Sequence, residues 1–117
     1  MIKLYGYKKC GTCRNAEKFL DRHGIEYEFI DITLNPPSKA QLKKVLTASG
    51  QPLKKLFNTS GQAYREMGLK DRVDSLSQTE VFSMLAENGK LIKRPIVFDG
   101  ETATIGFREE EFKQSWA

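Results

Sequence analysis

The most reactive side chains of this sequence are two cysteine thiols placed three positions apart. Cys10 and Cys13 are its only cysteines, and the small residues Gly11 and Thr12 separate them. A Cys-x-x-Cys pair where a strand gives way to a helix is typical of thiol–disulfide exchange. Because free N–H groups and the dipole at a helix N-terminus favour an anion, we expect Cys10 to be the attacking thiolate and Cys13 the resolving thiol.

Three other interpretations of the pair remain open at this point. The cysteines could be small buried hydrophobic residues, because free cysteine is often buried. They could be an inert surface pair. They could also be half of a zinc site, but His23 is the only further soft ligand and no second cysteine pair exists. We therefore expect no metal site.

Two arginines lie where they could act with the cysteines. Arg94 precedes Pro95 at the start of a predicted strand, and Arg108 opens the last predicted helix. A guanidinium group could bind an oxyanion with two hydrogen bonds or stabilise a thiolate, although each arginine could equally be a solvated surface residue. We expect Cys10, Cys13 and Arg94 to be catalytic. The expected substrate-binding residues are Gly11, Thr12, Arg14, Pro95 and Arg108.

The elements that must position these residues follow the order strand–helix–strand, several helices, then strand–strand–helix. Two capping boxes, Ser38 with Gln41 and Ser77 with Glu80, begin the inserted helices, and Asp99-Gly100 indicates a hairpin. This order predicts an α/β, thioredoxin-like fold with a mixed sheet, in a single domain over 1–117 with a helical insertion at about 38–90. The predicted strands are 2–6, 27–32, 95–98 and 102–105. The first predicted helix begins at Cys10 and ends at Gly24. The other predicted helices are 38–50, 77–88 and 108–116, with shorter helical pieces at 53–57 and 64–67.

Composition limits the compartments and partners that we expect. Hydrophobic residues make up 39% and charged residues 29% of the chain, the net charge is +4, and no long basic run is present. We therefore expect no direct nucleic-acid binding and no membrane association. The N-terminal segment lacks the apolar region of a signal peptide, so we expect a cytoplasmic protein, where thiol pairs are usually catalytic, sensing or metal-binding. We also expect a monomer.

Motifs along nearly the whole chain resemble the ArsC/Spx family of arsenate reductase-like proteins. The matching segments, in order, are Tyr5–Ala16 with the Cys-Gly-Thr-Cys-Arg turn, Leu56–Gly61 followed by Tyr64 and Met67-Gly68-Leu69, Lys93–Val97, and Gly106-Phe107-Arg108. The resemblance implies a thioredoxin-like sheet with a helical insertion. By analogy with thioredoxin-like folds, Pro95 would follow a cis peptide bond and face the cysteine turn, and an ordinary trans proline at the start of an edge strand is the alternative.

The same resemblance implies candidate activities. In arsenate reductases of the family, the cysteine at the position of Cys10 attacks arsenate, three arginines hold the oxyanion, and glutathione supplies the second thiol. Arg94 and Arg108 match two of those arginines, whereas the third falls near Asn58, where this chain has no arginine. Spx-type regulators share the Cys-x-x-Cys switch and bind the C-terminal domain of the RNA polymerase α subunit.

The first expectation is therefore a thiol–disulfide oxidoreductase, with Cys10 as nucleophile and Cys13 as resolving thiol. It would bind no cofactor and would use an external thiol donor, either glutathione with glutaredoxin or thioredoxin. One alternative is an arsenate reductase that uses a small thiol or thioredoxin. The other is a redox-switched transcriptional regulator that binds RNA polymerase.

Overall fold

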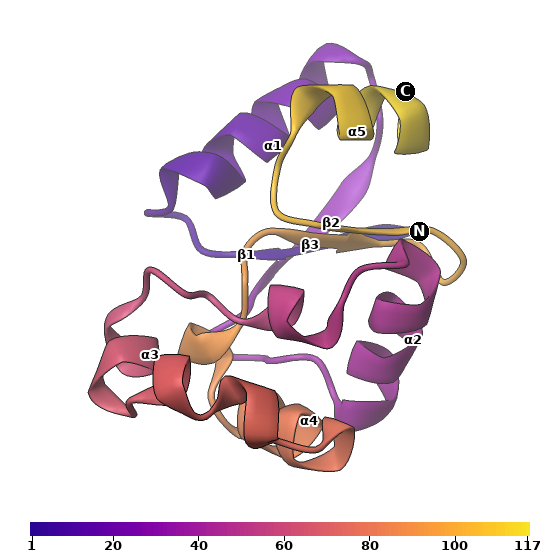
Figure 1. Ribbon diagram of the computed structural model, residues 1–117. Coiled ribbons are helices and arrows are strands. Elements are labelled where there is room, and N and C mark those ends of the chain that lie inside the picture. The colour runs from indigo at the N-terminus through magenta and orange to yellow at the C-terminus, as the bar shows by residue number, and fades with distance from the viewer.

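A four-stranded mixed sheet lies at the centre of the fold in the computed structural model, which describes residues 1–117 (Figure 1). Its order is β2-β1-β3-β4; β1 and β2 run parallel, and the other two pairs are antiparallel. With the helices between and after the strands, this is the expected thioredoxin-like α/β fold. The strands are β1 (Ile2–Gly6), β2 (Tyr27–Asp31), β3 (Ile96–Phe98) and β4 (Ala103–Ile105).

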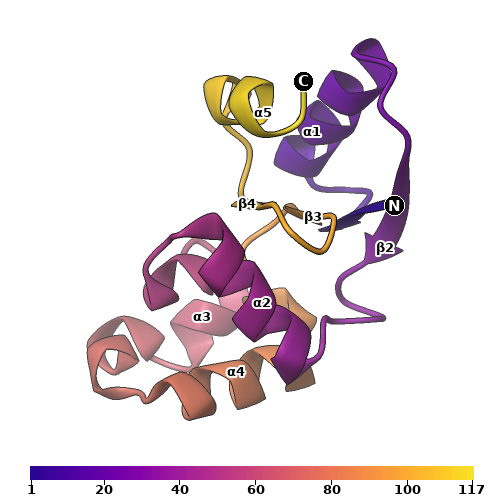
Figure 2. The same ribbon diagram turned by 90° about the vertical axis from the view of Figure 1, so that its right-hand side faces the viewer.

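Alternating side chains of the sheet build two separate hydrophobic layers. Leu4 and Val97 point to one face, where α1 (Gly11–Arg22) and α5 (Glu109–Ser115) cover them with Phe19 and Phe112. Tyr5, Ile96 and Phe98 point to the other face and join the larger cluster formed with the insertion. This alternation follows from the two-residue period of a strand. Figure 2 shows α1 and α5 on one side of the sheet and α2, α3 and α4 on the other.

The insertion between β2 and β3 contains helices and no strand of the sheet. Both predicted capping boxes are present, because the Ser38 and Ser77 hydroxyls accept backbone N–H groups of Gln41 and Glu80, whose side chains accept in return. None of the helices in the chain combines the length and apolar character needed to cross a membrane. The helical elements of the insertion are α2 (Lys39–Ser49), η1 (Leu53–Leu56), α3 (Gln62–Glu66), η2 (Leu69–Asp71), η3 (Val73–Ser75), α4 (Gln78–Glu87) and η4 (Gly89–Leu91).

A short antiparallel bridge ties the insertion to the segment that enters β3. Phe57 pairs with Ile92, the Lys93 N–H donates to the Leu56 carbonyl at 2.7 Å, and the Asn58 N–H donates to the Leu91 carbonyl at 2.7 Å. The bridge therefore sets the chain around residue 56 beside the chain that carries Lys93. It fixes the insertion next to the end of the sheet where the cysteines lie.

The predicted third strand begins one residue later than expected, at Ile96 rather than Pro95. Proline has no N–H to give to a sheet ladder, so pairing starts after it. The Arg94–Pro95 peptide is cis, as the analogy with thioredoxin-like folds suggested. The Pro95 carbonyl still takes part in local structure, because it accepts the N–H of Gly106 at 2.8 Å.

Candidate active site

Cys10 occupies the N-cap position of α1, as the sequence predicted. Its backbone is extended, with φ −85° and ψ 119°, and its Sγ accepts the backbone N–H of Cys13 at 3.3 Å. The Cys10 N–H donates to the Tyr7 carbonyl at 3.0 Å, which closes the turn between β1 and the helix. Cys10 is partly exposed. A thiolate on Cys10 would therefore have an N–H donor, the positive end of the helix and access to solvent.

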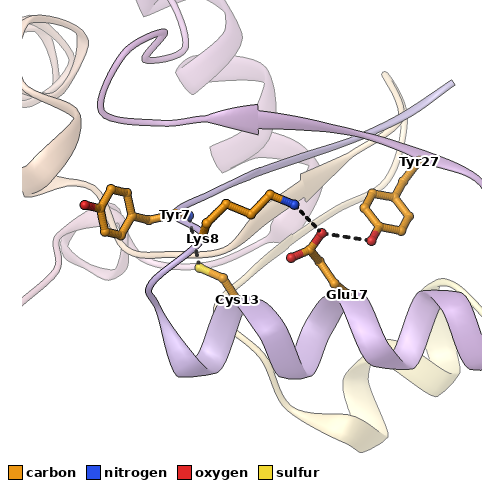
Figure 3. A network of polar contacts seen from close by, with 5 residues as sticks. All are labelled: Tyr7, Lys8, Cys13, Glu17 and Tyr27. Carbon is orange, nitrogen blue, oxygen red and sulfur yellow. Dashed lines mark hydrogen bonds and ion pairs between the residues drawn. The ribbon is translucent and has the colours of Figure 1, made fainter.

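Cys13 lies one turn further along α1 and is fully buried. The Tyr7 N–H points at its Sγ at 3.5 Å (Figure 3). Gly6, the last residue of β1, makes room for this thiol, because a Cβ there would lie 3.1 Å from the Cys13 Sγ and 3.0 Å from a Leu4 methyl group. Gly6 was not among the predicted site residues. A glycine that ends a strand just before a Cys-x-x-Cys turn was the available signal.

Burial raises the pKa of the Cys13 thiol from 9.0 to about 12, with the adjacent Cys10 as the second cause. The Tyr7 N–H and the positive charge of Arg94 act in the opposite direction, but more weakly. Cys13 consequently stays protonated at neutral pH in the reduced protein. The two cysteines thus have different environments, an exposed helix cap and a buried site, as an attacking and a resolving thiol would require.

The raised pKa of Cys13 predicts a loss of stability in alkaline solution. Above about pH 9 the unfolded chain releases the Cys13 proton, whereas the folded chain keeps it until about pH 12. The folded state binds more protons, so raising the pH favours unfolding by up to about 1.4 kcal/mol per pH unit in this window. Urea unfolding of the reduced protein and of Cys13→Ala should show the stability difference between them shrinking above about pH 9. A difference that does not change with pH would contradict the assignment.

A polar network anchors the loop that precedes the cysteines. The Lys8 ammonium group lies 3.3 Å from a Glu17 carboxylate oxygen, and the Tyr27 hydroxyl donates to the same oxygen at 3.0 Å (Figure 3). Lys8 also lies over the Phe29 ring, 4.1 Å from its centroid. Burial and the bond to Glu17 raise the pKa of Tyr27, so it remains a hydrogen-bond donor. The network joins the loop to α1 and β2, and the sequence analysis did not identify it.

Arg94 lies on the insertion side of the cysteine turn. Its guanidinium carbon is 5.7 Å from the centroid of the Tyr7 ring. Its charge reaches Asp31, whose pKa is lowered mainly by the Thr33 hydroxyl at 2.6 Å and to a lesser extent by Arg94. Since Tyr5 pairs with Ile96, Pro95 falls beside the end of β1 that leads into the turn. Arg94 lines a cavity of about 330 Å³ with Tyr7, Thr33, Asn58, Gly61, Gln62, Ala63 and Lys90.

Arg108 lies in a different cavity from Arg94. It caps α5, is exposed, and lines a space of about 350 Å³ that also contains Thr12. The two arginines that match oxyanion-binding arginines of the family therefore line separate cavities in this structure. Gly11 and Arg14 are exposed on the first turn of α1. The other residues that line the Arg108 cavity are Gln51, Lys55, Lys93, Ile105, Gly106, Phe107 and Glu111.

His23, the metal ligand considered for the cysteine pair, lies at the other end of the helix. It is the C-cap residue of α1, and its ring stacks on Phe19 with 4.3 Å between centroids. No group of three or more His, Cys, Asp or Glu side chains is arranged to hold a metal ion.

The chain combines a Cys-x-x-Cys pair at the start of the first helix with a cis proline just before β3. In a thioredoxin-like fold, this combination is typical of thiol-dependent proteins. A sequence profile of the ArsC family matches residues 5–115. The chain therefore belongs to the ArsC family, as the resemblance of its motifs indicated.

Relatives within this family differ in what their names state. An uncharacterised protein of Bacillus subtilis, YusI, is 49% identical over 116 residues, which cover 99% of this chain and 98% of that protein. The crystal structure of a possible arsenate reductase from Streptococcus mutans is 44% identical with a TM-score of 0.88, covering 97% of this chain and 98% of that one. The global transcriptional regulator Spx of Streptococcus mutans is 28% identical over 97% of this chain and 81% of its own length.

Proposed function

We propose that this protein is a thiol–disulfide oxidoreductase in which Cys10 attacks and Cys13 resolves. The observation that carries the proposal is the arrangement of the two thiols on one helix turn. Cys10 is partly exposed and accepts the N–H of Cys13 at 3.3 Å, while Cys13 is buried one turn behind it. A partner can thus reach Cys10, and Cys13 is close in sequence and space but shielded from the same partner.

The reaction would proceed in two exchanges. The Cys10 thiolate attacks one sulfur of the substrate disulfide, forms a mixed disulfide and releases the other substrate sulfur as a thiolate. Cys13 then gives its proton to the substrate thiolate released in the first exchange and attacks the Cys10 sulfur, which expels the second substrate thiolate and leaves a Cys10–Cys13 disulfide. The substrate gains two electrons, and an external thiol donor such as glutathione with glutaredoxin, or thioredoxin, restores the dithiol. We expect this cycle to operate in the cytoplasm.

Arsenate reduction is the weaker candidate for this site. The 44% identical Streptococcus mutans protein described as a possible arsenate reductase is the observation in its favour. The arrangement of the arginines weighs against it, because Arg94 and Arg108 line different cavities and Asn58 stands near the position of the third arginine. Three convergent guanidinium groups would be the natural site for a tetrahedral oxyanion.

A regulatory role is the other candidate, and it rests on the Spx relatives. The Spx protein of Streptococcus mutans matches 97% of this chain at 28% identity. In that role the Cys10–Cys13 pair would be a switch, and RNA polymerase would be the partner. A stable complex with the polymerase α C-terminal domain that depends on the redox state of the pair, without turnover of disulfides, would favour regulation over catalysis.

Redox titration followed by a turnover assay tests the proposed oxidoreductase. We expect the protein equilibrated in glutathione buffers to pass between dithiol and disulfide in a two-electron transition at roughly −220 to −320 mV. Thiol alkylation and mass measurement would report the populations. Catalytic reduction of a model protein disulfide with glutaredoxin or thioredoxin as donor should then follow. Absence of an intramolecular disulfide across the whole range would rule out the proposal.

A further inference from the structure

Three cationic side chains, Lys55, Lys93 and Arg108, line one cavity with Thr12 of the cysteine turn, and we call them the cationic trough. Lys55, Lys93 and Arg108 all line the cavity of about 350 Å³ that contains Thr12. Lys55 and Lys93 also line a second cavity of about 230 Å³, together with Lys54, Phe57, Thr59, Tyr64 and Val73. Because the two cavities share both lysines, they adjoin one another. The trough therefore extends from the cysteine turn onto the insertion.

The positions of the two shared lysines are fixed by the backbone. The Lys93 N–H donates to the Leu56 carbonyl at 2.7 Å, which places Lys93 beside the segment that carries Lys55. The stem of Lys93 then packs over Gly106, where a Cβ would meet its Cε at 3.3 Å. Gly106 has φ 82°, a left-handed conformation that favours glycine. It lies two residues before Arg108. The fold thus brings together cations from three separate segments.

None of these three cations forms an ion pair within the protein. The ion pairs of the structure are Lys8 with Glu17 and an exposed pair at 3.8 Å between Lys54 and Asp74. Glu111 is the single carboxylate that lines the larger cavity, against three cations. Like charges held close together repel one another, and an anion placed among them relieves that repulsion. The trough has the charge of a surface that receives an acidic ligand.

Thr12 connects the trough to the reactive sulfur. Thr12 lies between Cys10 and Cys13, is exposed, and lines the cavity with Lys55 and Arg108. A ligand whose sulfur meets Cys10 would therefore lead its neighbouring residues past Thr12 into the trough. Lysine ammonium groups on flexible stems act as separate point charges rather than a convergent cradle. Spread over two cavities, they suit several carboxylates along a chain better than a single oxyanion.

We propose that the cationic trough binds acidic residues next to the reactive cysteine of a partner protein, and so selects substrates with acidic segments around their disulfides. The proposal rests on the proposed thiol–disulfide function and adds its substrate class. Attraction between the trough and the acidic segment would act before exchange, by raising the rate of encounter and holding the disulfide at Cys10. The exchange itself would follow the two steps given above, with the electrons passing from the Cys10–Cys13 pair to the substrate.

Matched peptides test this proposal. Two short fluorescent peptides would carry one cysteine as a mixed disulfide with 2-mercaptoethanol, flanked by glutamates in one peptide and by glutamines in the other. We expect the reduced protein to react about tenfold faster with the glutamate peptide at low salt, and the ratio to fall toward one at high salt. The charge-reversal variant Lys55→Glu/Lys93→Glu should abolish or invert the ratio. The control Lys43→Glu/Lys44→Glu changes net charge equally on exposed positions of α2 and should retain it.

Binding provides a second readout that does not depend on turnover. Fluorescence anisotropy with serine in place of the peptide cysteine should show tighter binding of the glutamate peptide to the wild-type protein and to the Lys43→Glu/Lys44→Glu control, and weaker binding to Lys55→Glu/Lys93→Glu. Equal rates and equal binding for both peptides would overturn the trough while leaving the oxidoreductase intact. Preferential binding of the glutamate peptide without reduction of either peptide would support the trough as a docking surface and overturn the oxidoreductase.

Discussion

Replacing Cys10 by serine should lower the rate of disulfide reduction by at least about a thousandfold. The serine hydroxyl keeps the helix cap but is not ionised at neutral pH, so the N-terminal donors of α1 have no thiolate to stabilise. The nucleophile is lost while its surroundings remain. Stopped-flow measurement of peptide disulfide reduction, with the fold of the variant checked by circular dichroism, would report this loss.

The partner variant Cys13→Ser separates the two thiol roles. Cys10 should still attack the substrate, but the buried serine cannot resolve the product, so a mixed disulfide between Cys10 and the substrate should accumulate. Mass spectrometry under non-reducing conditions would detect this adduct. Substantial turnover in Cys10→Ser, or an adduct on Cys13 in the wild-type protein, would reverse the assigned roles.

The substitution Gly89→Ala should destabilise the fold by at least about 3 kcal/mol. Gly89 is buried, and a Cβ there would collide with the carbonyl oxygen of Ile32 and lie 3.1 Å from the Cα of Thr33. The obstacle is backbone rather than the tip of a flexible side chain, so the end of the insertion and the segment after β2 would have to separate. Urea unfolding followed by tryptophan fluorescence would measure the change, since Trp116 packs against the core.

Gly11→Ala provides the matched control for that prediction. Nothing lies within 4 Å of a Cβ built at Gly11, and the residue sits in the first turn of α1. Alanine is the better helix former, so this variant should be neutral or gain up to about 1 kcal/mol. Equal stability of the Gly89→Ala and Gly11→Ala variants would show that the contact between Gly89 and Ile32 is not tight in solution.

Arg94 and Arg108 illustrate how far sequence reasoning reached into the site. Their positions before a strand and at a helix start were correct, and Arg108 is indeed the N-cap of α5. Whether the two side chains act at one site depends on how the loops fold around the cysteine turn. In the structure the two arginines line separate cavities, and Lys93, the neighbour of Arg94 in sequence, lines the cavity of Arg108.

Features that depend on residues close together in the sequence could be predicted from the sequence alone. The capping boxes at Ser38 and Ser77, the two-residue alternation of β1 and the placement of Cys10 at a helix N-terminus all depend on residues within a few positions of each other. Such short-range preferences can be read from one chain, and they agreed with one another along the sequence. The order of strands and helices, and with it the thioredoxin-like fold, followed from them.

Contacts between segments that are distant in the sequence could be seen only in the folded structure. Gly89 has the sequence signature of a helix end, yet its lack of a Cβ matters because Ile32, remote in sequence, lies against it. Lys55 and Lys93 line the same cavity because the bridge between Phe57 and Ile92 brings their segments together. Long-range packing depends on the positions of whole elements rather than on neighbouring residues, so a local sequence pattern does not predict it. For this protein, the chemistry of the cysteine turn was local, and the surface that surrounds it was not.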